Sequence, residues 1–117
     1  MKFSQELRGN IQVVRELVAS VASNNLVSVK CRTSAYYNAR NGYIRFRMTA
    51  YAYGKVFGVD YAMSLSELEQ IKSLSTIVIK KFTTLANSLR GELERERLVH
   101  TRLDVVRNLF VADGEKP

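Results

Sequence analysis

The hydrophobic pattern at the start of the chain has the period of an α-helix. Within residues 4–23 the apolar side chains recur at spacings of three and four, which places them on one face of a helix. Asn24 and Asn25 are suited to end this helix, because asparagine tolerates the left-handed backbone conformation. The apolar positions are Phe3, Leu7, Ile11, Val14, Val18 and Val21.

From Leu26 onward the period changes to two, which is that of β-strands. Three alternating runs are separated by two turn signals, the Asn41-Gly42 pair and then Gly54-Lys55. Short turns between successive strands predict an antiparallel meander. The apolar side of the runs consists of Val27, Val29, Cys31, Thr33 and Ala35, then Ile44, Phe46, Met48, Ala50 and Ala52, then Phe57, Val59, Tyr61 and Met63.

A second helical pattern follows the third strand. Ser64 and Glu67 have the spacing of a capping box, in which each side chain bonds the backbone N–H of the other residue. Because an unbroken helix to residue 111 would outrun the sheet, we expect a break at Gly91, with one helix to about 90 and another over about 92–111. The apolar stripe comprises Leu68, Ile71, Leu74, Val78, Phe82, Leu85 and Leu89, and a further one comprises Val99, Leu103, Val106 and Phe110.

These elements predict an α+β fold in α-β-β-β-α order. The 117 residues, 46% of them apolar and 25% charged, suit a single domain over residues 1–117 with one buried core. We expect an N-terminal helix, a three-stranded antiparallel meander and one or two long C-terminal helices, with residues 112–117 as a frayed tail. The order is similar to that of double-stranded-RNA-binding domains. The similarity is one of topology, since Ser64–Glu69 stand where that family has a basic motif.

Candidate catalytic groups are scarce. Cys31 is the only cysteine and His100 the only histidine, and they stand about seventy positions apart, so neither a nucleophile–base pair nor a multi-cysteine zinc site is indicated. No glycine-rich nucleotide-binding loop is present. Glu92, Glu94 and Glu96 alternate with arginines, as on a solvated helix face. We therefore expect a protein that is not an enzyme and that needs no cofactor or metal.

Cellular location is indicated by what the sequence lacks. The first residues, Met1 to Glu6, become polar and charged at once, so we expect no signal peptide. The apolar runs are too short to cross a bilayer. A single cysteine provides no internal disulfide. We expect a cytoplasmic protein without membrane contact.

The charge of the chain is unevenly distributed. The net charge is +7, of which residues 1–60 contribute +6 and residues 61–117 contribute +1. Between Glu16 and Asp60 there is no acidic residue. A long stretch of one sign creates a potential that attracts polyanions.

The polar side of the first two strands combines arginine or lysine with tyrosine. Arginine binds phosphate through planar, bidentate contacts, and tyrosine offers a ring on which a base can stack. This combination predicts a nucleic-acid-binding sheet face, with single strands favoured. The turns on either side of the second strand extend the set. The candidate residues for binding nucleic acid or another anion are Lys30, Arg32, Tyr36, Arg40, Tyr43, Arg45, Arg47, Tyr51, Tyr53 and Lys55.

Other interpretations of this surface remain open at this point. Tyrosine and arginine are also enriched at protein interfaces, so the partner is alternatively an acidic protein surface, as for a small inhibitor or assembly factor of phage or mobile-element type. A third alternative is sequestration of a small anionic nucleotide. A plain solvated surface is the fourth.

The C-terminal segment suggests self-association. Its apolar stripe continues beyond Leu89, where a sheet of three short strands has little surface left to cover. The mixed charges of residues 90–97 are typical of the flanks of paired helices. We expect residues 90–111 to act as an oligomerisation helix and the protein to be a homo-oligomer.

Overall fold

The computed structural model describes residues 3–27 and 29–114, with side chains described up to residue 109. It confirms the predicted fold, an N-terminal helix, a three-stranded antiparallel sheet and a long C-terminal helix. The elements are α1 (Gln5–Asn25), β1 (Lys30–Asn38), β2 (Tyr43–Ala52), β3 (Lys55–Ser64), α2 (Leu65–Glu69) and α3 (Ile71–Gly114).

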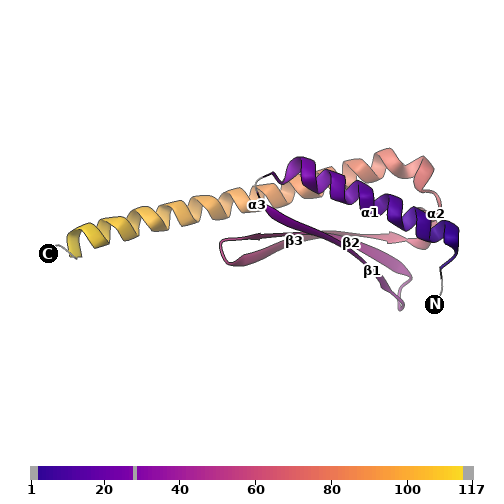
Figure 1. Ribbon diagram of the computed structural model, residues 1–117, viewed down its shortest axis with the longest axis horizontal. Coiled ribbons are helices and arrows are strands. Elements are labelled where there is room, and N and C mark those ends of the chain that lie inside the picture. The colour runs from indigo at the N-terminus through magenta and orange to yellow at the C-terminus, as the bar shows by residue number, and fades with distance from the viewer. Residues whose placement is uncertain (1–2, 28, 115–117) are drawn as a thin grey trace.

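The molecule has two layers. The strands lie in the order β1-β2-β3, and the helices all lie on one side of the sheet (Figure 1). Helix α1 packs on β1, α3 packs on β3, and the two helices contact each other. The opposite face of the sheet has no helix over it (Figure 1).

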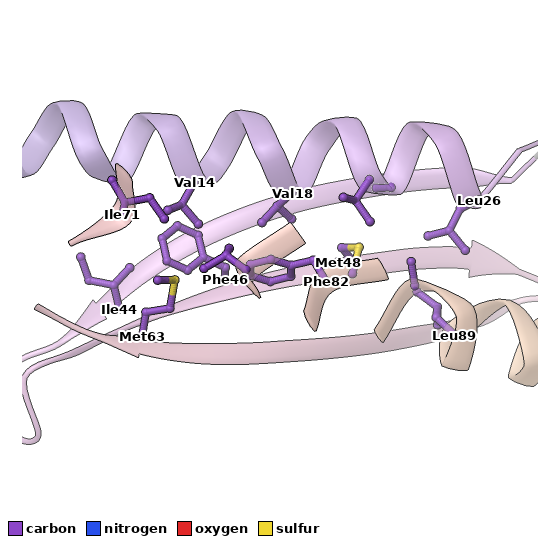
Figure 2. Close-up of a cluster of buried hydrophobic side chains, with 14 of the residues drawn as sticks. Val14, Val18, Leu26, Ile44, Phe46, Met48, Met63, Ile71, Phe82 and Leu89 are labelled. Carbon is purple, nitrogen blue, oxygen red and sulfur yellow. The ribbon is translucent and has the colours of Figure 1, made fainter. Parts of the chain in front are cut away.

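The core lies between the helices and the inner face of the sheet (Figure 2). From β2 it receives Ile44, Phe46 and Met48, each no more than 2% exposed, because alternate residues of a strand point to the same face. The rings of Phe46 and Tyr61 both meet Phe82 of α3 edge-on, with centroids 6.2 and 5.7 Å away. This arrangement confirms the first stripe predicted for the C-terminal helix and the apolar alternation predicted for the strands, except at Val27, which precedes β1 and is 70% exposed.

Side chains cap the starts of α1 and α2. In α1, Ser4 Oγ accepts a hydrogen bond from the Leu7 N–H at 3.1 Å. Before α2, Ser64 Oγ accepts from the Glu67 N–H at 3.1 Å, and Glu67 Oε1 accepts from the Ser64 N–H at 3.2 Å. The capping box is therefore confirmed. Satisfying otherwise unpaired N–H groups at a helix start is worth about 1 kcal/mol per cap.

Two strand boundaries differ from the prediction. Strand β1 begins at Lys30 rather than near Leu26, because Leu26 caps α1 with its N–H bonded to the Ala22 carbonyl and is 5% exposed. The second hairpin turn consists of Tyr53 and Gly54, one residue earlier than expected. Both have positive φ, at 55° and 70°, which is the combination that a two-residue type I′ turn requires.

The C-terminal helix does not break at Gly91, so that prediction was wrong. The break occurs instead at Gln70, whose N–H bonds the Glu67 carbonyl and ends α2. Gly91 lies between Leu89 and Leu93, which are 0% and 7% exposed and pack into the core. These contacts on both sides of the glycine outweigh its helix penalty of about 1 kcal/mol. Of the residues expected to form a frayed tail, 112–114 are part of α3, and residues 115–117 lie outside the described residues.

Replacing Gly91 by alanine is expected to stabilise the protein by about 1 kcal/mol, because alanine loses less backbone freedom in a helix. A Cβ atom at this position would meet Arg95 Nη1 at 3.6 Å, an ordinary contact. For a chain of this length the melting temperature should rise by about 4 °C. Thermal unfolding followed by circular dichroism tests this, and a lower melting temperature would contradict a continuous helix at Gly91.

Helix α3 extends well beyond the sheet (Figure 1). Its 44 residues correspond to about 66 Å at about 1.5 Å per residue. Leu93 is the last core residue, and Glu96 and His100 still contact the β2–β3 hairpin. In the described part of the chain, none of the helices combines the length and hydropathy that a membrane span requires.

Candidate functional site

The sheet surface that faces away from the helices is called the open face here. Its composition follows from the strand register, in which Tyr36 pairs with Arg45, and Arg47 with Asp60. The open face thus joins the polar side of β1 and β2 to a third row of small or short side chains from β3. Its residues are Lys30, Arg32, Ser34, Tyr36 and Asn38 from β1, Tyr43, Arg45, Arg47, Thr49 and Tyr51 from β2, and Val56, Gly58, Asp60, Ala62 and Ser64 from β3.

Three tyrosines project from the open face at its two ends. Tyr36, Tyr43 and Tyr51 are 48%, 40% and 39% exposed, so each ring offers a substantial surface to a ligand. Tyr36 and Tyr43 lie near the β1–β2 turn, whereas Tyr51 lies opposite Lys30 at the other end. Tyr43 and Tyr51 are eight residues apart on one strand, a span of about 27 Å at about 3.4 Å per residue.

Between the tyrosines, two arginines share one carboxylate. Arg45 Nη1 donates to Asp60 Oδ1 at 2.9 Å, and Arg47 Nη1 lies 4.0 Å from Asp60 Oδ2. Arg47 also lies across Gly58, since a Cβ atom on that residue would stand 2.6 Å from Arg47 Nη2. Asp60 therefore draws both guanidinium groups toward β3, and Arg47 also lies against Gly58, while both arginine side chains remain partly exposed.

The other cations of the site are exposed. Lys30 and Arg32 extend from the edge strand β1, and Arg40 lies in the β1–β2 turn. The turn is fixed by Asn38, whose Oδ1 accepts from the Arg40 N–H at 3.0 Å and whose carbonyl accepts from the Gly42 N–H at 3.0 Å. The four cations of the strands and Arg40 contribute five positive charges and Asp60 one negative charge, so the site has a net charge of +4.

Tyr53 and Lys55, which were also predicted in the site, lie elsewhere. The Tyr53 ring stacks on His100 of α3 with centroids 4.6 Å apart, and Lys55 Nζ binds Glu96 Oε1 at 2.7 Å. The hydrogen bond from Lys55 lowers the pKa of Glu96, and His100 Nε2, 3.2 Å from the same oxygen, acts in the same direction. These contacts fasten the β2–β3 hairpin to α3 instead of serving the open face.

The isolated reactive groups do not form a catalytic constellation. Cys31 is half-buried on the core side of β1, and burial raises the pKa of its thiol, so the nucleophilic thiolate is disfavoured. His100 is engaged with Glu96 and Tyr53. Among the described residues no cluster of three or more His, Cys, Asp or Glu side chains could hold a metal ion.

Of the ten predicted site residues, the structure places seven on the open face: Lys30, Arg32, Tyr36, Tyr43, Arg45, Arg47 and Tyr51. Arg40 lies beside it in the turn. The residues that the sequence reasoning left out of the site are Asp60 and Gly58. Both lie on the polar side of the third alternating run, so the sequence pattern predicts the face of the sheet on which they lie. It does not predict their contacts with the arginines, which depend on the register between β2 and β3.

Comparison of the chain with protein-family models, curated proteins and solved structures gives no significant match.

Proposed function

We propose that the protein is a non-enzymatic, cytoplasmic domain that binds single-stranded nucleic acid on the open face. One observation carries the proposal: exposed tyrosine rings and guanidinium groups share a sheet surface that no helix covers. Polyanions are attracted by the net positive charge, and exposed rings provide stacking that tolerates any base. A duplex hides the faces of its bases, so stacking on these rings favours single strands.

The roles of the residues follow from their positions. Tyr43 and Tyr36 would stack bases near the β1–β2 turn, and Tyr51 would stack a base at the other end. Arg32, Arg45 and Arg47 lie between them and would contact phosphates. The span of about 27 Å corresponds to roughly four to eight nucleotides, depending on how far the strand is stretched.

The direct test is fluorescence anisotropy with labelled single-stranded DNA, single-stranded RNA and duplex oligonucleotides at several salt concentrations. Binding should be micromolar or tighter at low salt, and log K should fall linearly with log salt by about 0.7 for each single-strand phosphate contact. The absence of binding at low salt would remove the proposal. A defined protein partner with weak salt dependence would then favour the alternative of an acidic protein surface.

Replacing Asp60 by asparagine is expected to tighten this binding by about tenfold. The carboxylate competes with phosphate for Arg45 and Arg47, and removing its charge raises the net charge of the site by one. Anisotropy titrations of D60N and the wild-type protein measure the change. Glu69→Gln, an exposed carboxylate on α2, is the charge-matched control and should leave the affinity nearly unchanged. Equal or weaker binding by D60N would argue against phosphate contacts at these arginines.

We further propose that the protruding part of α3 pairs with the same segment of a second copy. Six large apolar side chains between Leu98 and Leu109 are each at least 44% exposed, including Val99, Leu103 and Val106 of the predicted stripe. The side chain of Phe110 lies outside the described residues. The charges over residues 98–109 are Arg102, Asp104 and Arg107 and nearly balance, so two copies can approach without strong repulsion. An isolated helix of this length is marginal in water, and pairing would stabilise it.

Val106→Glu is expected to weaken this self-association at least about 100-fold, because a carboxylate in an apolar contact costs several kcal/mol. Asn108→Glu introduces the same charge on the opposite side of the helix and should have little effect. Sedimentation equilibrium of the three proteins gives their masses. A monomeric wild-type protein at millimolar concentration would contradict the proposal.

A further inference from the structure

A cavity of about 440 Å³ lies at the end of the sheet where β1 begins. It is bounded by the α1–β1 connection, by the end of β2 with its turn, and by α3. Its lining includes the apolar residues Leu26 and Leu93 and the aromatic residues Tyr51 and Tyr53. Its volume is within the range of about 300–1,000 Å³ that is typical of small-molecule sites.

The charged side chains of this cavity favour an anion. Lys30, Arg90 and Arg97 line it together with one carboxylate, Glu94, so its net charge is +2. Lys30 and Arg90 are both exposed. Neither arginine of α3 belonged to the predicted site, because the mixed charges of residues 90–97 were interpreted as a solvated helix face. The continuous helix brings both of them to the same cavity.

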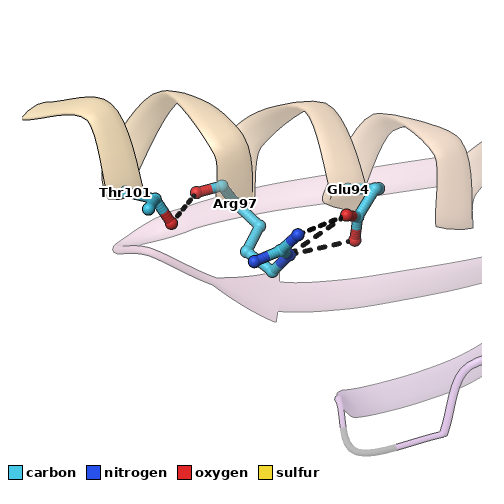
Figure 3. Close-up of polar contacts among 3 residues, drawn as sticks. All are labelled: Glu94, Arg97 and Thr101. Atoms are coloured by element: carbon cyan, nitrogen blue, oxygen red, sulfur yellow. Dashed lines mark hydrogen bonds and ion pairs between the residues drawn. The ribbon is translucent and has the colours of Figure 1, made fainter.

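The guanidinium of Arg97 is oriented in advance (Figure 3). Its Nη2 donates to Glu94 Oε1 at 2.6 Å, and its Nε donates to both carboxylate oxygens at 3.1 Å. These bonds use Nε and Nη2, so Nη1 takes part in none of them and keeps two N–H donors for a ligand. A fixed guanidinium loses less side-chain freedom on binding than a mobile one.

The cavity shares two residues with the open face. Lys30 and Tyr51 line it, and both also line a second hollow of about 280 Å³ together with Cys31 and Arg32. A strand lying along β2 would therefore lead past Tyr51 into the cavity. Tyr53, whose ring stacks on His100, also lines the cavity.

We propose that the cavity binds a nucleotide that carries a phosphate monoester, namely the phosphorylated end of a single strand held on the open face. A phosphate monoester carries more negative charge than the diesters within a strand, so a cluster of three cations selects it. The tyrosines would contact the terminal base. The assignment to a strand end rests on the proposed function, whereas a free nucleoside monophosphate has the same chemistry and is tested beside it.

The experiment compares four labelled single-stranded 12-mers of one sequence: with a 5′-phosphate, with a 3′-phosphate, without a terminal phosphate, and circularised. We expect one of the phosphorylated strands to bind about tenfold more tightly than the unphosphorylated strand and the circle, the scale of one charge-assisted hydrogen bond. Arg90→Gln should remove this preference and retain the binding of the unphosphorylated strand. Arg107→Gln, on α3 beyond the cavity, is the matched control and should retain the preference.

The other outcomes separate the two proposals. Equal affinity for all four strands, with no binding of adenosine monophosphate or cytidine monophosphate in calorimetry, would overturn the proposal that the cavity binds a phosphate monoester. It would not contradict the proposed binding of single strands on the open face. The protein could instead bind a nucleoside monophosphate, lose this binding in Arg90→Gln, and bind none of the strands. This result would overturn the proposed function and the assignment of the ligand to a strand end, and it would support a site for a free nucleotide.

Discussion

Replacing both Arg45 and Arg47 by alanine is expected to weaken the binding of single-stranded oligonucleotides at least about tenfold at 0.1 M salt. Each arginine that contacts a phosphate releases counterions, so the slope of log K against log salt should become shallower by about 1.4 for the pair. Neither side chain belongs to the core, because both lie on the open face and are only half-buried. The fold should therefore persist, and circular dichroism verifies that it does.

The carboxylate of Asp60 also affects the affinity of the double variant. In the double variant its carboxylate loses both partners and would repel phosphate. Adding Asp60→Asn to the double variant removes this repulsion, so the part of the loss that persists is due to the missing phosphate contacts. The control is Lys72→Ala with Lys80→Ala, two exposed cations of α3 on the other side of the sheet. An unchanged salt slope in the arginine variant, or an equal change in the control, would contradict binding on the open face.

Phe82→Ala is expected to reduce the free energy of unfolding by about 3–5 kcal/mol. The ring is 1% exposed and contacts Phe46 and Tyr61 edge-on, so its removal leaves a cavity at the point where α3 meets two strands. Since small domains are stable by only about 5–15 kcal/mol, this loss is a large share of the total. The melting temperature should fall by about 12–20 °C.

Urea unfolding of Phe82→Ala beside Ile77→Ala measures this effect with an internal control. Ile77 lies on the same helix and is 64% exposed, so its truncation should change the stability by less than about 1 kcal/mol. A loss below about 1 kcal/mol for Phe82→Ala would show that α3 is not held on the sheet by this contact. The packing of α3 on the sheet, which places Arg90 and Arg97 at the cavity, would then be unsupported.

The features that the sequence predicted correctly depend on local or periodic patterns. The alternation of Ile44, Phe46 and Met48 defines the buried face of β2, and the opposite face then follows by geometry. The capping box at Ser64 and Glu67 is a contact between near neighbours. Seven of the ten candidate residues were placed on one surface for the same reason, since alternation alone determines the face of a strand.

The features that escaped prediction depend on contacts between distant segments. Tyr53 adopts a positive φ and stacks on His100, and neither property follows from its place in an alternating run. Gly91 remains helical because Leu89 and Leu93 are buried on either side. The ion pairs of Asp60 required the register between β2 and β3, which a one-residue shift of the turn alters. In each of these three cases, contacts between distant segments determine the structure, and the local sequence pattern does not reveal them.

The unbroken course of α3 has a hydrodynamic consequence. The molecule measures 71 × 27 × 18 Å, and its radius of gyration is 19.5 Å, compared with about 13.4 Å for a compact domain of this length. Such an elongated particle meets more friction than a sphere of the same 13.3 kDa mass, so it diffuses and sediments more slowly. A monomer will therefore elute from a sizing column where a compact protein of considerably greater mass elutes.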